Sequence, residues 1–272
     1  MKETIVNFDS LDGIKLQGSL RKPPGKIKYA VLLVHGITVD RNEDGFYTEF
    51  ATNLEQINAA SLRFDLRSHG KSEGKYEELT LTGVMNDIGS ALKELKKKIP
   101  SRTPVSIIAA SFGGGLSAYW VSEHPNEIKT LVLLNPVLNY GQRMLYSKSY
   151  WSKDHITTGG AKILQKQGWL HHGSFRMGRA LINELFYVKP FEKISDIMIP
   201  ILTIHGDKDS MVPISVSKKF AKSNKKSEFM SIKGADHGFT NPGDEDFTHP
   251  NTLQFQSIVF NKVLSWINKN GR

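Results

Sequence analysis

The amino-acid sequence predicts an α/β fold in which a mainly parallel central sheet has helices on both faces. Short apolar runs alternate along the chain with longer stretches whose apolar residues recur at helical spacing, which is typical of this fold class. Some runs are apolar at consecutive positions, as in Val31-Leu32-Leu33-Val34, which is expected of a strand buried on both faces. Polar residues follow several of these runs, and functional groups gather at the carboxyl ends of parallel strands.

The first predicted element is a hairpin, because alternating runs at residues 4–8 and 14–20 flank Asp12-Gly13. Further strands are predicted from continuous apolar runs, and helices from apolar residues three or four apart, as at Val84, Ile88 and Leu92. Before residue 139, the other predicted strands lie at residues 30–34, 60–64, 105–109 and 128–134. The predicted helices lie at residues 46–57 and 81–95, and a third begins at the Gly-rich turn after residue 109 and ends at residue 120.

The same alternation returns near the C-terminus. Strands are predicted at residues 199–204 and 227–232, and helices at residues 215–223 and 255–267. Residues 139–189 lie between the two alternating parts and are mostly helical by pattern. We therefore predict a core made of residues 1–138 and 190–272, with residues 139–189 inserted into it.

Composition excludes several classes of protein. The chain has 272 residues, of which 39% are hydrophobic and 10% aromatic, so it can bury a large core and is not expected to be disordered. It has no cysteine, which excludes a disulfide framework, a thiolate zinc site and a cysteine nucleophile. This composition fits a reducing cytoplasm, the location that we expect. No signal peptide is expected from the first residues, and no apolar run approaches the ~20 residues of a membrane span.

The net charge of +9 is concentrated in one segment. Residues 139–189 carry six of the nine net positive charges and many aromatic side chains, whereas the rest of the chain is nearly neutral. The charge could attract an anionic substrate or an acidic partner, or the lysines could simply face water while the aromatic side chains pack. Nucleic acid is not an expected partner, because no nucleic-acid module is recognised.

Ser111 is the candidate nucleophile. It lies in Ala109-Ala110-Ser111-Phe112-Gly113, directly after a predicted strand and at the start of a predicted helix. A strand–turn–helix around a nucleophile needs small residues two positions before and two after it, and Ala109 and Gly113 meet that need. The same string would also fit a serine that only caps a Gly-rich helix.

His237 and Asp209 are the candidate base and acid. A serine hydroxyl needs an imidazole to remove its proton, and His237 follows the last predicted strand. The imidazole needs a carboxylate to fix its tautomer, and Asp209 is preferred to Asp207 because it fits Gly-x-x-Asp-x-x-Val-Pro. Asp65 is interpreted instead as a structural carboxylate that pairs with Arg63 or Arg67.

Acyl transfer also needs donors for an oxyanion. The residue after the nucleophile supplies one backbone N–H, which is that of Phe112, and the loop after the strand at residues 30–34 supplies the other, at Ile37 in His35-Gly36-Ile37-Thr38.

Over nearly its whole length the chain resembles the serine α/β-hydrolases, and within them the bacterial cinnamoyl and feruloyl esterases. The motifs that carry the resemblance are His35-Gly36-Ile37-Thr38, the stretch from Arg63 to Ser72, the turn around Ser111, the stretch from His205 to Pro213, and Gly234-Ala235-Asp236-His237. The resemblance implies an α/β-hydrolase fold, the triad Ser111, Asp209 and His237, the oxyanion donors Ile37 and Phe112, and ester cleavage without a cofactor or a metal. It also implies that residues 139–189 form a lid.

The substrate-binding residues are expected in the lid and beside the oxyanion loop. The candidates are His35, Tyr140, Trp151 and Trp169. The expected partner is a small-molecule ester or thioester, which could be anionic. An acidic carrier protein and a homodimer are open alternatives.

The sequence therefore predicts a serine esterase that works through an acyl-enzyme intermediate. An acyl thioesterase or acyltransferase, acting on acyl groups bound to coenzyme A or a carrier protein, would use the same chemistry and is suggested by the basic segment. A lyase or C–C hydrolase would use the same triad. A non-catalytic binding protein with this fold is the alternative of another class.

Overall fold

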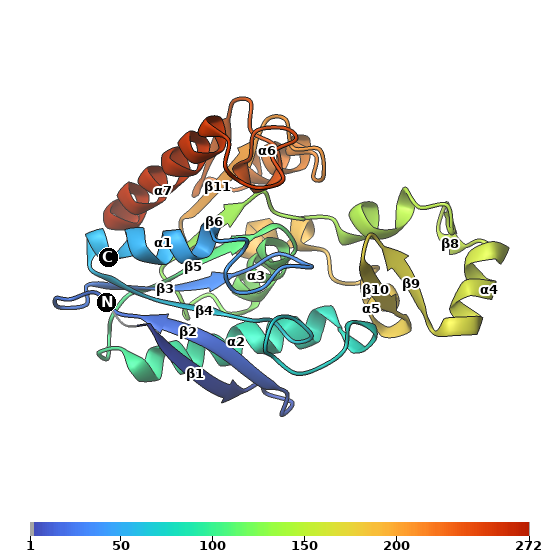
Figure 1. The fold of residues 1–272 in the computed structure, drawn as a ribbon, viewed down its shortest axis with the longest axis horizontal. Helices are drawn as coiled ribbons and strands as arrows, with labels where there is room; N and C mark the ends of the chain where they lie inside the picture. Colours follow the sequence, from blue (N-terminus) through green and yellow to red (C-terminus); the bar gives the residue numbers. More distant parts are fainter. Residues whose placement is uncertain (1–2, 272) are drawn as a thin grey trace.

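The computed structural model describes residues 3–271, and within them an eight-stranded sheet forms the centre of the molecule (Figure 1). The strand order is β1-β2-β4-β3-β5-β6-β11-β12. β1 and β2 form an antiparallel edge, and the other six strands of this sheet pair with one another in parallel. The predicted hairpin and the mainly parallel sheet are thus confirmed. The strands of the sheet are β1 Thr4–Asp9, β2 Lys15–Arg21, β3 Tyr29–Val34, β4 Ala59–Phe64, β5 Val105–Ala110, β6 Thr130–Leu134, β11 Ile201–Gly206 and β12 Ser227–Ile232.

Helices connect the strands and cover the sheet. The helices are α1 Phe46–Leu54, α2 Leu81–Lys98, α3 Ser111–Glu123, α4 Thr158–Gln167, α5 Arg179–Glu184, α6 Ile214–Lys222 and α7 Pro250–Asn270. Short helical turns are η1 Glu55–Ile57, η2 Tyr76–Glu78, η3 Gln142–Tyr146, η4 Pro190–Asp196 and η5 His237–Phe239. Within residues 3–271 no helix combines the length and the apolar character needed to cross a membrane.

The sheet separates two hydrophobic cores, and β3 shows why the fold has this form. Alternate side chains of a strand point to opposite faces, so Leu32 packs into one core and Leu33 into the other. The first core is shared with α2 and α3, and the second with α1 and α7, where Phe46 and Phe50 pack against Phe260. Burial on both faces is the physical reason for the uninterrupted apolar run of β3.

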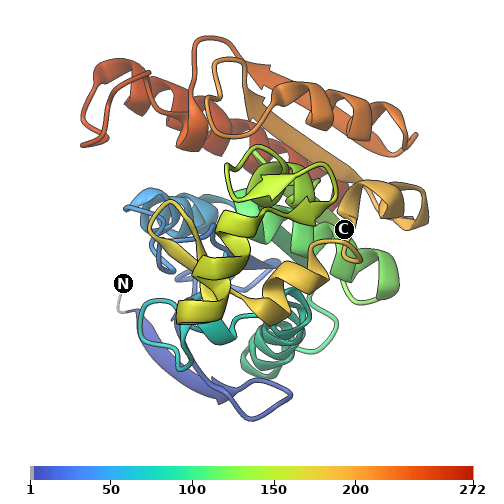
Figure 2. The same cartoon turned by 90° about the vertical axis from the view of Figure 1, so that its right-hand side faces the viewer.

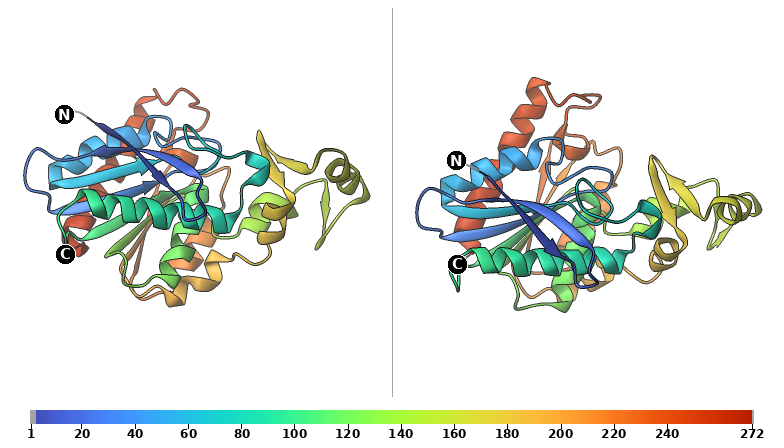
Figure 3. Two further views of the ribbon diagram at one scale, coloured as in Figure 1. Left: turned by 90° about the horizontal axis from the view of Figure 1, so that it is seen from below. Right: turned by 60° about the horizontal axis from the view of Figure 1, so that its bottom comes forward.

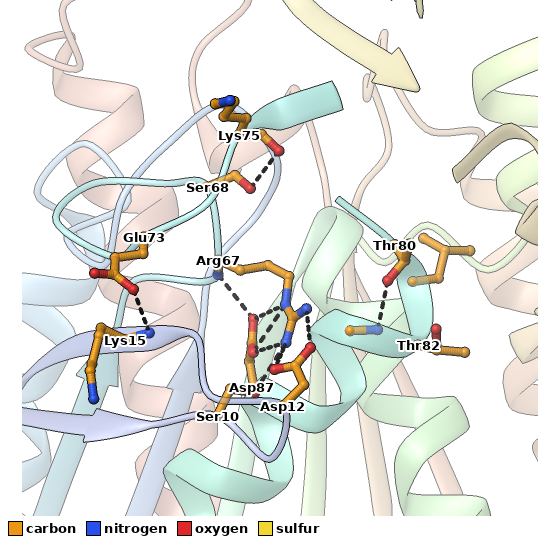
Figure 4. A network of polar contacts seen from close by, with 12 residues as sticks. Ser10, Asp12, Lys15, Arg67, Ser68, Glu73, Lys75, Thr80, Thr82 and Asp87 are labelled. Carbon is orange, nitrogen blue, oxygen red and sulfur yellow. Dashed lines mark hydrogen bonds and ion pairs between the residues drawn. The ribbon is translucent and has the colours of Figure 1, made fainter. Parts of the chain in front are cut away.

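A buried arginine joins the N-terminal hairpin to α2 (Figure 4). Arg67 donates to both carboxylate oxygens of Asp87 on α2, to Asp12 at the hairpin turn and to the Ser10 hydroxyl. The expected pairing of Asp65 with Arg63 or Arg67 is therefore wrong. Asp65 instead forms its ion pair with Arg41, 2.5 Å away, because the chain after β3 passes directly over the end of β4.

Residues 139–189 project from the end of the molecule opposite the chain termini (Figures 1 and 3), and viewed from that end they lie across its middle (Figure 2). The segment is not mostly helical, which corrects the prediction. It contains the turn η3, α4 and α5, and also two antiparallel hairpins, β7–β8 and β9–β10. The strands of these hairpins are β7 Trp151–Ser152, β8 His155–Ile156, β9 Trp169–His172 and β10 Phe175–Gly178. The tight turn of the second hairpin is made by Gly173, whose φ of 60° suits glycine.

Candidate active site

Ser111 occupies a sharp turn between β5 and α3. Its φ is 46°, a left-handed value that costs a non-glycine residue about 1–3 kcal/mol and that functional sites often retain. The turn is possible because Ala109 and Gly113, two positions before and two after Ser111, are small. A Cβ added to Gly113 would lie 2.4 Å from the carbonyl oxygen of His35, so only glycine lets the start of α3 pass this close to β3. The result is a serine side chain that faces a cavity at the carboxyl end of the sheet.

Three side chains from three separate loops form a line at this turn. His237 Nε2 lies 3.1 Å from Ser111 Oγ, and His237 Nδ1 lies 2.8 Å from Asp209 Oδ2. Nδ1 must carry the proton in order to donate to the carboxylate, which leaves the lone pair of Nε2 facing the serine hydroxyl. The structure thus brings together the three residues that the sequence singles out, in the geometry that a nucleophile, a base and an orienting acid require.

Asp209 is held by more groups than the sequence indicates. Its Oδ1 accepts the backbone N–H groups of Met211 and Val212, and its Oδ2 lies 3.0 Å from Nε2 of His205 as well as beside His237. Burial raises the pKa of Asp209, but the hydrogen bonds from His205 and His237 outweigh burial and hold this pKa well below its usual range. Asp209 is therefore ionised at any pH near neutrality.

The sequence does not predict a role for His205. It is completely buried, and its Nδ1 lies 2.8 Å from the hydroxyl of Ser217, so its ring is fixed at both nitrogens. The only sequence signal for it is its position four residues before Asp209, at the end of β11.

A cavity of about 520 Å³ opens above Ser111. Ile37 and Phe112 both border it, so the two backbone positions expected to hold an oxyanion lie next to the nucleophile. This volume is in the range of small-molecule sites. The residues that line it come from the loop after β3, the turn at Ser111, the segment 139–189 and the loop around His237.

Glu43 is a second residue that the sequence does not reveal. Its Oε2 accepts the backbone N–H of Gly36 at 2.8 Å, directly beside Ile37, and it borders the cavity. Burial raises the pKa of Glu43 to about 8, against the opposing effect of the Gly36 N–H, and Asp44 and Asp40 raise it further. The carboxyl group is therefore largely uncharged at neutral pH.

The four side chains expected to bind substrate lie elsewhere. His35 is fully buried and fixed by the backbone of Leu66 and Gly36, and the hydroxyl of Tyr140 donates to the carbonyl of Phe112 beneath the turn. Trp151 packs on Phe186, and Trp169 packs on other side chains of the segment 139–189. None of the four borders the cavity at Ser111, so the structure gives no support to a substrate-binding role for them.

Comparison with known proteins places the chain in a family. Residues 25–168 match the family model described as serine aminopeptidase, S33, and residues 172–270 match that of the dienelactone hydrolase family. A monoacylglycerol lipase of Mycolicibacterium smegmatis is 24% identical over 293 residues, covering 96% of this chain and 95% of the lipase.

Solved structures show the same fold. Est1E from Butyrivibrio proteoclasticus, determined with bound ferulic acid, superposes with a TM-score of 0.79 at 22% identity, over 97% of this chain and 98% of Est1E. The mouse alpha/beta hydrolase domain-containing protein 10 gives a TM-score of 0.74 at 16% identity, over 98% of this chain and 99% of that protein.

The fold is that of the α/β-hydrolases, as the sequence predicts. The chain belongs to the serine aminopeptidase S33 family, whose model covers more than half of it. It is a serine hydrolase of the esterase and lipase type, which confirms the predicted class of enzyme.

Proposed function

We propose that the protein hydrolyses carboxylic esters of small molecules through an acyl-enzyme intermediate. Ser111 Oγ attacks the acyl carbonyl while His237 Nε2 takes its proton, and Asp209 stabilises the imidazolium that forms. The backbone N–H groups of Ile37 and Phe112 hold the oxyanion. His237 then returns the proton to the leaving alcohol, which departs as the C–O bond breaks.

Deacylation repeats these steps with water. His237 removes a proton from a water molecule, the hydroxide attacks the acyl-Ser111 ester, and the proton passes to Ser111 Oγ as the carboxylic acid is released. No cofactor enters this scheme.

One observation supports the proposal above the others. The continuous line from Ser111 Oγ through His237 to Asp209, with separations of 3.1 Å and 2.8 Å, lies beside a cavity that two backbone N–H positions also border. A serine that only capped α3 would need neither a histidine at its hydroxyl nor a carboxylate behind that histidine. This geometry also argues against a non-catalytic binding protein.

We further propose that residues 139–189 act as a roof over the acyl pocket. Arg143, Met144, Lys148 and the turn from His172 to Ser174 border the same cavity as Ser111. A roof of this kind excludes water and shapes the site around the acyl group. The cytoplasmic location, a homodimer and an acidic carrier protein stay predictions.

The test is a substrate panel with the Ser111→Ala variant as its control. We expect turnover of short aryl esters, with kcat/KM falling by at least ~10³-fold in Ser111→Ala, since a serine triad acts as a unit. Labelling of Ser111 by a fluorophosphonate should be lost in the same variant. Substantial hydrolysis by Ser111→Ala would overturn the mechanism.

The panel also includes hydroxycinnamate esters and acyl thioesters. A clear preference for acyl-coenzyme A or acyl-carrier substrates over oxygen esters would replace the esterase by the thioesterase alternative, with the same catalytic residues.

A further inference from the structure

The positive charge of residues 139–189 is not spread evenly around the active site. Several of its cations are already engaged: Arg176 pairs with Glu77, Arg179 donates to the carbonyl of Leu164, and Lys189 pairs with Glu192. Three others are exposed and border no part of the cavity, namely Lys153, Lys162 and Lys166. Only Arg143 and Lys148 border the cavity that contains Ser111.

Arg143 lies on η3 and is half-buried at the cavity. Burial lowers the pKa of Arg143, and the negative charge of Asp209 partly opposes that effect. Arg143 lines the same cavity as Ser111 and His237. Within residues 3–271 neither Arg143 nor Lys148 forms an ion pair with a carboxylate. A half-buried cation is costly unless an anion compensates it.

The surroundings of the two cations favour an anion from outside the protein. His172 is the last residue of β9 and lines the same cavity, and burial together with the charges of Arg143 and Lys148 lowers the pKa of His172 to about 4. It is therefore neutral at physiological pH and adds no third charge. Its Nδ1 is buried without a hydrogen-bond partner in the described chain, and the residue is only 7% exposed.

Acidic residues on the other wall do not cancel this charge. Glu43 and Asp44 border the cavity from the loop after β3, but Glu43 is mainly uncharged at neutral pH and is occupied with the Gly36 N–H. Asp44 is exposed. The wall formed by residues 139–189 therefore presents two positive charges to a mainly apolar pocket that also contains the nucleophile.

We propose that Arg143 and Lys148 bind an anionic group of the substrate, so that the protein prefers esters bearing a carboxylate to neutral esters of the same size. This inference rests on the proposed esterase function and narrows its substrate class. An arginine fork suits a carboxylate because it can donate two parallel hydrogen bonds, while Lys148 adds a point charge. The ester carbonyl would then lie at Ser111, with the anion held under the roof.

Matched pairs of esters test the proposal. The first pair is 4-nitrophenyl hydrogen adipate, with its anion in the acyl part, against 4-nitrophenyl hexanoate. The second pair is 4-acetoxybenzoate, with its anion in the leaving part, against its methyl ester. In each pair the measured quantity is the selectivity ratio, the kcat/KM of the anionic ester divided by that of the neutral ester, after subtraction of the rate with Ser111→Ala.

We expect a ratio well above one in at least one pair, and the pair that shows it tells which side of the ester carries the anion. Arg143→Gln should lower that ratio by roughly 10- to 100-fold, as expected for the loss of a charge-assisted hydrogen bond, and Lys148→Met by a smaller factor. Arg143→Lys should retain part of the ratio. Raising the salt concentration should lower the ratio in the unmodified protein.

Lys162→Gln is the matched control, because it removes one charge from the same segment at an exposed position away from the cavity. Its ratio should equal that of the unmodified protein. Ratios near or below one in both pairs, with brisk hydrolysis of the neutral esters, would overturn the anion site and leave the esterase intact. An equal fall of the ratio in Lys162→Gln and Arg143→Gln would also overturn it. If the unmodified protein hydrolyses none of the four esters faster than Ser111→Ala does, the proposed function itself is contradicted.

Discussion

Asp209 shows how one carboxylate can organise the candidate active site. Two backbone N–H groups and two imidazoles surround it, and every one of these groups donates a hydrogen bond. Since the group is held as an anion, both histidines must present a protonated nitrogen to it, and the tautomer of His237 follows. His205 is thus a positioning residue, because it reaches the reaction centre only through Asp209.

Glu43 has the opposite electrostatic role. Its carboxyl group holds the Gly36 N–H next to the expected oxyanion donor Ile37, and its pKa of about 8 keeps it mainly protonated at neutral pH. Ionisation would place a negative charge beside a developing oxyanion. The rate of ester hydrolysis should therefore fall as pH rises through about 8 and Glu43 ionises.

Glu43→Gln tests this interpretation, because glutamine can still accept the Gly36 N–H but cannot ionise. In the unmodified protein kcat/KM should fall as pH rises through about 8, and in Glu43→Gln that fall should be weaker or shifted to higher pH. The pH–rate profile of a neutral ester measures both. If kcat/KM falls with rising pH in the same way in both proteins, the ionisation of Glu43 does not cause the fall.

The same substitution has a consequence for stability. Folding raises the pKa of the Glu43 carboxyl from 4.5 to about 8, so below pH 4.5 the group is protonated in both the folded and the unfolded chain. Between pH 4.5 and 8 the unfolded chain ionises while the folded chain keeps the proton, and the free energy of unfolding falls progressively over this window. Glu43→Gln should therefore raise the free energy of unfolding at pH 7, by about 1–3 kcal/mol, and should have little effect at pH 4.

At this scale the sequence reveals residues whose signal is local. Ser111, Asp209 and His237 each lie in a short motif directly after a strand, and the structure brings them together. Glu43 and His205 act through contacts made only in the folded chain, so no pattern marks Glu43, and His205 is marked only by its position four residues before Asp209. The large apolar surface of Trp151 and Trp169 favours a prediction of substrate binding, whereas in the structure both side chains pack within residues 139–189.

Among the elements, the β5–α3 turn and the start of α3 leave no room for a side chain at two of their glycines. Gly113 passes the backbone of His35, and a Cβ on Gly115 would lie 2.0 Å from the carbonyl oxygen of Val137. The start of α3 is therefore wedged between the ends of β3 and β6. This wedge holds Ser111 in its left-handed conformation.

Gly113→Ala should damage both stability and activity. Its methyl group would meet a backbone carbonyl at 2.4 Å, which must shift, so we expect destabilisation of about 1–3 kcal/mol and at least a ~10-fold loss of kcat/KM. Thermal unfolding and ester hydrolysis measure the two effects. Gly159→Ala is the matched control. A Cβ on Gly159 would have its nearest neighbour, Thr157 Oγ1, 3.9 Å away, and Gly159 lies in α4, where alanine is favoured over glycine. Full activity in Gly113→Ala would contradict the wedge.

An element can be predicted from the sequence where one residue pattern spans its whole length. The continuous apolar run of β3 and the helical spacing of α2 each lead to one structure. In residues 139–189 the strands have two to four residues, shorter than the repeat needed to separate a strand from a helix. In the second hairpin, buried and exposed residues alternate on both sides of Gly173-Ser174. This alternation can be recognised only after the pairing of β9 with β10 is known.

On the scale of the whole molecule, residues 139–189 are joined to the core by specific contacts on the side of α2. Phe175 packs edge-on against Tyr76 with ring centroids 4.9 Å apart, and Arg176 pairs with Glu77. Glu184 on α5 accepts hydrogen bonds from the backbone N–H groups of Leu81 and Thr82 and from the Thr82 hydroxyl. The base of the segment thus caps a helix of the core, which favours a fixed roof over a mobile lid.

The hydrophobic contacts lead to the same conclusion. Leu170, Phe175 and Met177 of the hairpin are completely buried and belong to the core that α2 and α3 share. Separating the segment from the sheet would expose these side chains to water, at a cost of about 1.5–3 kcal/mol for each. The segment should therefore unfold together with the sheet.

Glu184→Ala tests whether residues 139–189 and the sheet are one cooperative unit. The substitution removes a carboxylate from the N-terminus of α2, where it satisfies otherwise unpaired N–H groups and favours the helix dipole, and this should cost about 0.5–2 kcal/mol. Because the contact joins two parts of one unit, thermal unfolding should keep a single transition at a lower midpoint, whether it is followed by far-ultraviolet or near-ultraviolet circular dichroism.

Glu192→Ala is the control. It removes an exposed carboxylate that pairs with Lys189, and it should leave the midpoint almost unchanged. Two separate transitions, in the unmodified protein or in Glu184→Ala, would mean that the segment opens independently of the sheet and would replace the fixed roof by a mobile lid.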